Sequence, residues 1–146
     1  MSSTKIVLTA EVVPHVALDF MNNTHFEELD MVQSLGELIT DYQQSDNATL
    51  SHALKAWYEH TQAHFSRENE LMMDIHFPMY PMHSGEHARV LEEMELMVTS
   101  WNHNYDIALL SEYVFTAWPQ WFEQHVNSMD MVTAQFAVMN GYEPHK

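Results

Sequence analysis

The sequence contains no cysteine among its 146 residues, and this absence excludes several kinds of chemistry. Disulfide bonds, zinc sites with thiolate ligands, iron–sulfur clusters and thiol nucleophiles all need cysteine. Any metal site or reactive group must therefore use nitrogen and oxygen atoms. Glycine and proline are also scarce, at three and five residues, which leaves few of the turns that hairpins need and predicts long helices joined by few loops.

Basic residues are scarce as well, with five Lys and Arg against 21 Asp and Glu and a formal net charge of −16. Binding to the phosphates of nucleic acids needs clustered positive charge, and so does binding to an anionic membrane surface. We therefore expect neither partner. Hydrophobic residues still make up 46% of the chain, so the acidity indicates a soluble folded protein rather than a disordered one.

No apolar stretch of the sequence is long enough to span a membrane. The first residues lack the charged start, long apolar region and small-residue cleavage site of a signal peptide, so we expect a cytoplasmic location. The length is typical of one domain. We predict a single domain over residues 1–146, with an N-terminal arm at 1–16 and a helical bundle at about 17–140.

Apolar residues recur at steps of three and four along four stretches, which is the spacing of one face of an α-helix. Polar segments or prolines separate these stretches, which run from Leu18 to Ile39, Leu50 to Ile75, His83 to Trp101 and Ile107 to Phe136. Pro119 falls inside the fourth stretch, where we expect a kink or a restart of the helix. Four amphipathic helices with short connections predict an all-α, up-down-up-down four-helix bundle.

Histidine is unusually frequent, with 11 residues, and several histidines interrupt the apolar stripes. Six polar residues stand where the helical period requires a core residue, with at least one on each predicted helix: His25, His64, Glu68, His83, His87 and His125. Buried imidazoles and carboxylates are costly unless they are hydrogen-bonded or bound to metal. Because histidine is also the commonest metal ligand, we predict a metal site in the bundle core.

The spacing of these residues supports a shared site. His64 and Glu68 are four residues apart, as are His83 and His87, so each pair lies on one helix face. Asp130 follows His125 by five residues, a spacing that turns it well round an α-helix, so periodicity alone does not select Asp130. A helical bundle whose histidines only titrate is the competing interpretation, and it predicts no stoichiometric metal.

Taken together, the residues resemble the hemerythrin family, most closely its single-domain bacterial members. The matching motifs are His64-Phe65-x-x-Glu68, Phe77-Pro78, His83-x-x-x-His87 and Trp121-Phe122-x-x-His125-Val126-x-x-x-Asp130, with His25 followed by Leu29 upstream. The resemblance extends from about Leu18 to Asp130 and includes all seven ligand positions at spacings like those of the family. The combined pattern is specific, although each motif alone would be weak.

The resemblance implies two iron ions in the bundle core. His83, His87 and His125 would bind one iron, His25 and His64 the other, and Glu68 and Asp130 would bridge them together with an oxo or hydroxo group. One iron is then six-coordinate and the other five-coordinate, and dioxygen would bind at the open position. By the same resemblance, the wall of the oxygen pocket would be formed by Phe65, Trp121, Phe122 and Val126, for which ordinary core packing is the alternative.

Several positions depart from the family pattern. Asn22, Thr24 and Asn69 stand where acidic residues or glutamine are common, and such changes beside the ligands bear on oxygen affinity. His60 lies one turn before His64. It is a candidate for a hydrogen bond behind the ligands or for an alternative ligand, although a surface position is the commoner case.

The function implied by the resemblance is reversible dioxygen binding for carriage, storage or sensing, with an unidentified protein as oxygen acceptor. The alternative is an enzyme in which the same centre reduces peroxide, oxygen or nitric oxide. No Tyr, Lys or extra carboxylate is evidently placed as a general acid or base at the open iron, which favours binding over catalysis. The chain also lacks the Glu-x-x-His pair of ferritin-like oxidases and the His-Glu-x-x-His motif of zinc proteases.

Overall fold

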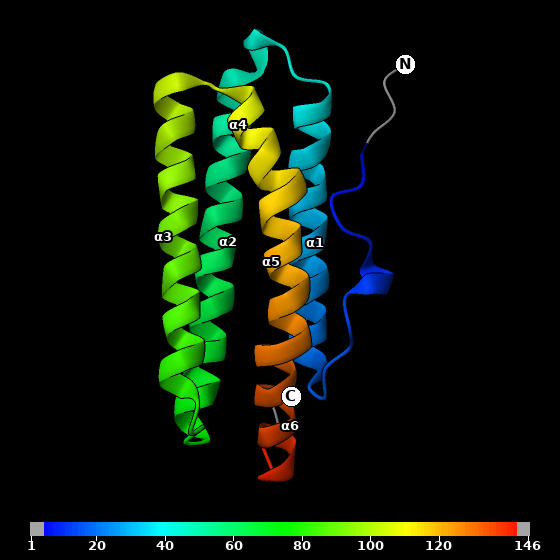
Figure 1. Cartoon of the computed structure of the whole chain (residues 1–146), viewed down its shortest axis with the longest axis vertical. Coiled ribbons are helices and arrows are strands. Elements are labelled where there is room, and N and C mark those ends of the chain that lie inside the picture. The colour runs from blue at the N-terminus through cyan, green and yellow to red at the C-terminus, as the bar shows by residue number, and fades with distance from the viewer. Residues whose placement is uncertain (1–4, 143–146) are drawn as a thin grey trace.

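The chain is an all-helical bundle in the computed structural model, which describes residues 5–142. Residues 1–4 and 143–146 lie outside the described range, and they include the first residues of the predicted arm and of the segment inspected for a signal peptide. Within that range, four helical runs stand side by side and alternate in direction along the chain (Figure 1). The predicted up-down-up-down four-helix bundle is therefore confirmed. Among the described residues, no helix has the length and apolar character needed to cross a membrane.

Three of the four helical runs are uninterrupted α-helices. They are α1 (Asp19–Thr40), α2 (Asn47–Asp74) and α3 (Tyr80–Asn104). Short 3-10 turns lie on the N-terminal side of the first two, η1 at Ala10–Val12 and η2 at Gln44–Asp46. Pro81 lies in the first turn of α3, where its missing N–H costs nothing, so α3 begins before the apolar period that starts at His83.

The fourth helical run alternates α-helix with wider π turns. Its parts are α4 (Ile107–Glu112), η3 (Tyr113–Ala117), α5 (Trp118–His125), η4 (Val126–Asp130) and α6 (Met131–Met139), of which η3 and η4 are π segments. A new α segment starts at Trp118, directly before Pro119, so the change from π to α geometry falls at the position where a kink or a restart is expected. The backbone stays helical because the wider π turn before Pro119 accommodates a residue that has no N–H to donate.

The N-terminal arm is fastened along the outside of α1 (Figure 1). The Asn22 side chain accepts a hydrogen bond from the Val16 N–H at 2.8 Å and donates one to the Val16 carbonyl at 3.0 Å. A carboxylate in its place could not donate, so asparagine suits this contact. Gly36 permits the close approach of the arm, because a Cβ there would lie 2.8 Å from Val7 Cγ2.

An apolar core fills the space between the four helical runs. Side chains with no exposed surface include Met21, Val32, Leu50, Val114 and Val126. Polar groups buried in such a core need partners, because they have lost their contact with water.

Candidate metal centre

Seven polar side chains lie together in the bundle core, and they are the seven ligands that the sequence predicts. They are His25 of α1, His64 and Glu68 of α2, His83 and His87 of α3, and His125 and Asp130 of the fourth run. All seven side chains are buried. The structure thus brings every predicted ligand to one place, and each helical run supplies at least one.

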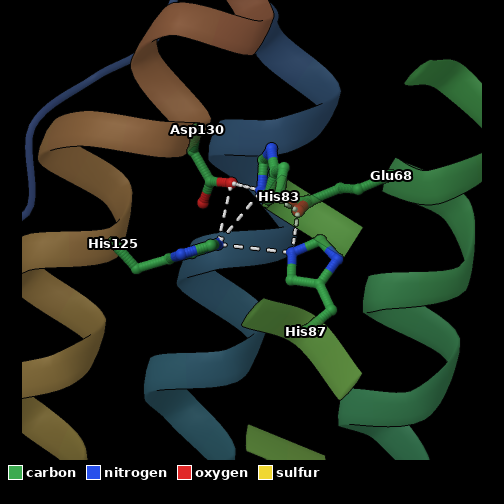
Figure 2. Close-up of side chains that lie close together, drawn as sticks. All are labelled: Glu68, His83, His87, His125 and Asp130. Atoms are coloured by element: carbon green, nitrogen blue, oxygen red, sulfur yellow. Dashed lines mark hydrogen bonds and ion pairs between the residues drawn. The ribbon is translucent and has the colours of Figure 1, made fainter. Parts of the chain in front are cut away.

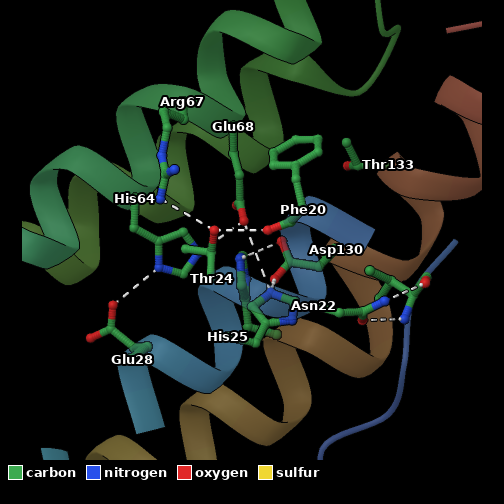
Figure 3. A network of polar contacts seen from close by, with 12 residues as sticks. Phe20, Asn22, Thr24, His25, Glu28, His64, Arg67, Glu68, Asp130 and Thr133 are labelled. Atoms are coloured by element: carbon green, nitrogen blue, oxygen red, sulfur yellow. Dashed lines mark hydrogen bonds and ion pairs between the residues drawn. The ribbon is translucent and has the colours of Figure 1, made fainter. Parts of the chain in front are cut away.

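The ligand atoms form two overlapping groups, within each of which they lie no more than 4.8 Å apart. The first, here called the three-histidine group, contains Glu68, His83, His87, His125 and Asp130 (Figure 2). The second, the two-histidine group, contains His25, His64 and Glu68 (Figure 3). Because Glu68 belongs to both groups, they are neighbouring halves of one site.

Both carboxylates turn one oxygen toward each half of the site. Glu68 Oε1 lies 3.2 Å from His87 Nε2, and Glu68 Oε2 lies 2.9 Å from His64 Nε2. Asp130 Oδ2 lies 3.0 Å from His25 Nε2, while its Oδ1 lies 3.1 Å from the nearest imidazole of the three-histidine group. A carboxylate placed in this way can bridge two metal ions.

Several atoms of the cluster converge without satisfying one another. Glu68 Oε1 and Asp130 Oδ1 have no hydrogen-bond partner among the described residues, although imidazole nitrogens lie 3.2 Å and 3.1 Å away. His125 Nε2 lies 3.2 Å from His83 Nε2, yet a neutral imidazole carries only one N–H. Buried polar groups are normally paired, so this convergence of lone pairs fits a bound cation.

The outward-facing nitrogens of two histidines are held by acceptors that the sequence analysis missed. His64 Nδ1 donates to Glu28 Oε1 at 3.1 Å, and His83 Nδ1 donates to Thr133 Oγ1 at 2.8 Å. A hydrogen bond from Nδ1 fixes the tautomer and leaves the Nε2 lone pair free to bind metal. Glu28 and Thr133 each lie three residues after a predicted ligand, so polar residues one helical turn from the ligands would include both, without indicating which histidine each contacts.

Two of the departures from the family pattern retain polar roles beside the cluster. Asn69 Oδ1 accepts a hydrogen bond from His87 Nδ1 at 2.9 Å, as a carboxylate would. The Thr24 hydroxyl donates to the Phe20 carbonyl at 2.8 Å and accepts from Arg67 Nη2 at 3.2 Å (Figure 3). Asn69 therefore supports a ligand without adding a charge, and Thr24 connects α1 to α2.

The charges in the cluster stabilise one another. Burial alone would raise the pKa of Glu28, but hydrogen bonds from His60 and His64 lower that pKa to about 2. Burial would also lower the pKa of His64, yet the negative charge of Glu68, with hydrogen bonds to Glu28 and Glu68, raises it to about 10. The raised pKa of His64 favours its imidazolium form, so a metal ion that binds Nε2 would have to displace the proton on that nitrogen.

The π segment η4 explains how Asp130 joins the site. His125 ends α5 and Asp130 ends η4, five residues later. In a π turn the backbone hydrogen bonds join residues five apart, so this spacing brings the two side chains toward one face. His125 Nε2 and Asp130 Oδ1 consequently lie 3.2 Å apart.

Aromatic rings cover the histidines of both halves. Phe65 stacks on His87 with a centroid distance of 4.1 Å, and Trp121 stacks on His125 at 4.6 Å. A third ring, that of Phe122, contacts His25 edge-on at 5.6 Å. These rings and the buried Val126 are the residues predicted to wall an oxygen pocket; they lie beside the ligands, and their role toward oxygen stays a prediction.

An antiparallel helical bundle that buries imidazoles and carboxylates from all four runs belongs to the class of metal-binding helical bundles. Residues 14–137 match the family described as the Hemerythrin HHE cation binding domain. The chain therefore belongs to the hemerythrin family, as the sequence motifs predict.

Two relatives carry the name Bacteriohemerythrin. The relative from Aquifex aeolicus is 25% identical over 116 residues, which cover 80% of this chain and 86% of the relative. The relative from Ralstonia nicotianae is 36% identical over 89 residues, which cover 61% of this chain and 64% of the relative. No solved structure matches the chain.

Proposed function

We propose that the chain binds two iron ions in its core cluster and binds dioxygen reversibly there, for carriage, storage or sensing. The observation that carries this proposal is the position of Glu68 and Asp130, each of which turns one oxygen toward each half of the site. One ion would take His83, His87 and His125, and the other would take His25 and His64. The two carboxylates would lie between them.

The donor set of the cluster suits iron. Five imidazoles and two carboxylates form a mixed nitrogen and oxygen set, whereas magnesium and calcium prefer oxygen ligands alone. His64 and His83 already direct Nδ1 to outside acceptors and Nε2 into the cluster, which is the orientation a metal ligand needs.

The unequal number of histidines supports dioxygen binding on the two-histidine side. Two ferrous ions held by these residues would supply the two electrons that reversible dioxygen binding needs, and His25 and His64 would leave more room for an added ligand than three histidines do. Phe65 and Phe122, both buried, pack against His64 and His25 of this half. Their rings exclude water and protons from it, which favours release over irreversible reduction.

An anaerobic optical titration tests this function. The protein is loaded with ferrous iron, its metal content is measured, and visible spectra are recorded on adding and then removing oxygen. The proposal predicts a charge-transfer band that appears with oxygen and disappears on deoxygenation. Irreversible oxidation without this band would contradict it and would direct attention to the reduction of peroxide, oxygen or nitric oxide.

Paired variants connect the band to the cluster. His25→Ala removes one ligand from the two-histidine half and is expected to abolish the reversible band. His52→Ala is the matched control, because His52 is an exposed histidine of α2, and it should leave the band unchanged. A band that persists in His25→Ala would mean that oxygen binds elsewhere.

A further inference from the structure

Glu28 is a buried carboxylate outside the seven candidate ligands, and four side chains donate hydrogen bonds to it. Its Oε1 accepts from His60 Nδ1 at 3.0 Å and from His64 Nδ1 at 3.1 Å. Its Oε2 accepts from Trp57 Nε1 at 2.5 Å and from Thr61 Oγ1 at 2.8 Å. Only 1% of Glu28 is exposed, so these four donors replace the water that a carboxylate would otherwise bind.

The position of Glu28 points to a role in the site rather than in packing alone. Burying a carboxylate is costly, and an apolar side chain would fill the same space without this cost. Glu28 contacts the outward nitrogen of His64, whose inward nitrogen lies 2.9 Å from Glu68 Oε2 (Figure 3). A carboxylate in this position orients the imidazole and makes its inward nitrogen a stronger donor to metal.

The acceptors behind the three-histidine group carry no charge. His83 donates to the hydroxyl of Thr133, and His87 donates to the side-chain amide of Asn69. His125 Nδ1 has no hydrogen-bond partner among the described residues. Among the described hydrogen bonds, a carboxylate therefore accepts from the outward nitrogen of a histidine in the two-histidine group and from none in the three-histidine group, where Glu86 acts on His125 without a hydrogen bond.

We propose that Glu28 is a positioning residue for the metal centre, which holds His64 toward its ion and places a negative charge on the two-histidine side. Nearby negative charge stabilises the more highly charged, oxidised metal pair, so Glu28 lowers the reduction potential of the pair. His60, which is 22% exposed at the rim, holds Glu28 in place together with Trp57 and Thr61. The proposal depends on the proposed binding of two iron ions, and it is independent of whether oxygen binds reversibly.

The test compares Glu28→Gln with Glu27→Gln in the iron-loaded full chain. Both changes remove one negative charge from adjacent positions of α1, but Glu27 is exposed. Glutamine keeps the size of Glu28, but its amide nitrogen cannot accept hydrogen bonds, so the two donors that face that side lose their acceptor. Iron content, iron affinity by chelator competition, midpoint potential by spectroelectrochemistry and helicity by circular dichroism are measured for each variant.

The expected result is specific to Glu28. Glu28→Gln should lower iron affinity on the order of 10- to 100-fold and shift the midpoint potential in the positive direction, whereas Glu27→Gln should change neither. Equal values for the two variants, with helicity retained, would overturn the proposal. If Glu28→Gln does not fold, His60→Ala is measured instead, because His60 holds Glu28 in place at the rim. A smaller shift of the midpoint potential in the same direction supports the proposal, and no shift overturns it.

The wild-type protein separates this inference from the proposed function. Wild-type chains that take up no iron would overturn the proposed function, and the role of Glu28 with it. Wild-type chains that take up two iron ions, with Glu28→Gln indistinguishable from them in affinity and potential, would overturn only the role of Glu28.

Discussion

The two halves of the candidate centre use the same kinds of ligand but have different surroundings. The three-histidine group takes its histidines from α3 and α5, and neutral acceptors stand behind two of them. The two-histidine group takes its histidines from α1 and α2, and the carboxylate of Glu28 stands behind one. One half therefore offers more ligands, whereas the other offers fewer ligands and a carboxylate hydrogen-bonded to one of them.

This difference suggests that the two halves of the centre have different roles. Three histidines from the protein leave less room for an exogenous ligand, so the three-histidine half is suited to holding its ion. Under the proposed function, the two-histidine half would leave a position free on its ion, and the charge behind His64 would favour an ion that gives up electrons. The predictions below test how far the halves are independent, from the largest expected effect to the smallest.

The largest effect is expected from Glu68→Ala, because Glu68 belongs to both halves. A methyl group cannot replace a carboxylate that faces two ligand groups, so the variant should lose both ions. Iron content after anaerobic loading measures this loss, with His52→Ala as the control. Retention of both ions in Glu68→Ala would mean that the halves bind metal independently.

Phe122→Ala removes a ring that covers the two-histidine half. Phe122 is buried, stacks on Trp118 with a centroid distance of 4.6 Å and contacts His25 edge-on. The cavity should lower the free energy of unfolding of the metal-free chain by about 3–5 kcal/mol. It should also speed irreversible oxidation of the iron-loaded protein by admitting water. Chemical denaturation and the decay of the visible spectrum measure the two effects, and a stability loss without faster oxidation would show that the ring only packs the core.

Acid sensitivity of the metal-free chain should come in part from Glu28. Its pKa falls from the ordinary 4.5 to about 2 on folding, because hydrogen bonds from His60 and His64 outweigh burial. Its contribution to stability, roughly 3 kcal/mol, is therefore fully present above pH 4.5 and is lost as the pH falls toward 2. Urea unfolding between these pH values should be less steeply pH-dependent in Glu28→Gln than in Glu27→Gln. Equal slopes would contradict the assignment.

The smallest effect is expected from Thr133→Val in the three-histidine half. The change removes the neutral acceptor behind His83 and keeps the shape of the side chain. Loss of one neutral hydrogen bond costs about 1–3 kcal/mol when its partner stays buried, so iron affinity should fall by no more than about 100-fold. Chelator competition measures the change, and the midpoint potential should move less than in Glu28→Gln. A larger shift in Thr133→Val would reverse the proposed difference between the halves.

The bundle and the meeting of the ligands could be predicted from the sequence because both depend on helical periodicity. Polar residues on an apolar stripe, such as His64 and Glu68, must face the core if the helix packs at all. Helical periodicity does not select Asp130, because a π turn rather than an α-helix carries this residue to the site. The resemblance to the family predicted Asp130 as a ligand instead.

The hydrogen-bond partners of the residues behind the ligands could not be predicted from the sequence. Glu28 lies beside the apolar stripe of α1, and only the packing of α1 against α2 brings it to His64. His60 was expected more often at the surface, and the structure places it at the rim with a hydrogen bond to Glu28. Such contacts depend on how two helices are rotated against each other, which the period of one helix does not determine.

The central claim is that two carboxylates join the two halves into a site for a pair of metal ions. Native mass spectrometry of the wild-type chain, loaded anaerobically with ferrous iron, tests it most directly. The account predicts a mass increase of two iron ions per chain. A chain that takes up one ion, or none, under these conditions would contradict it.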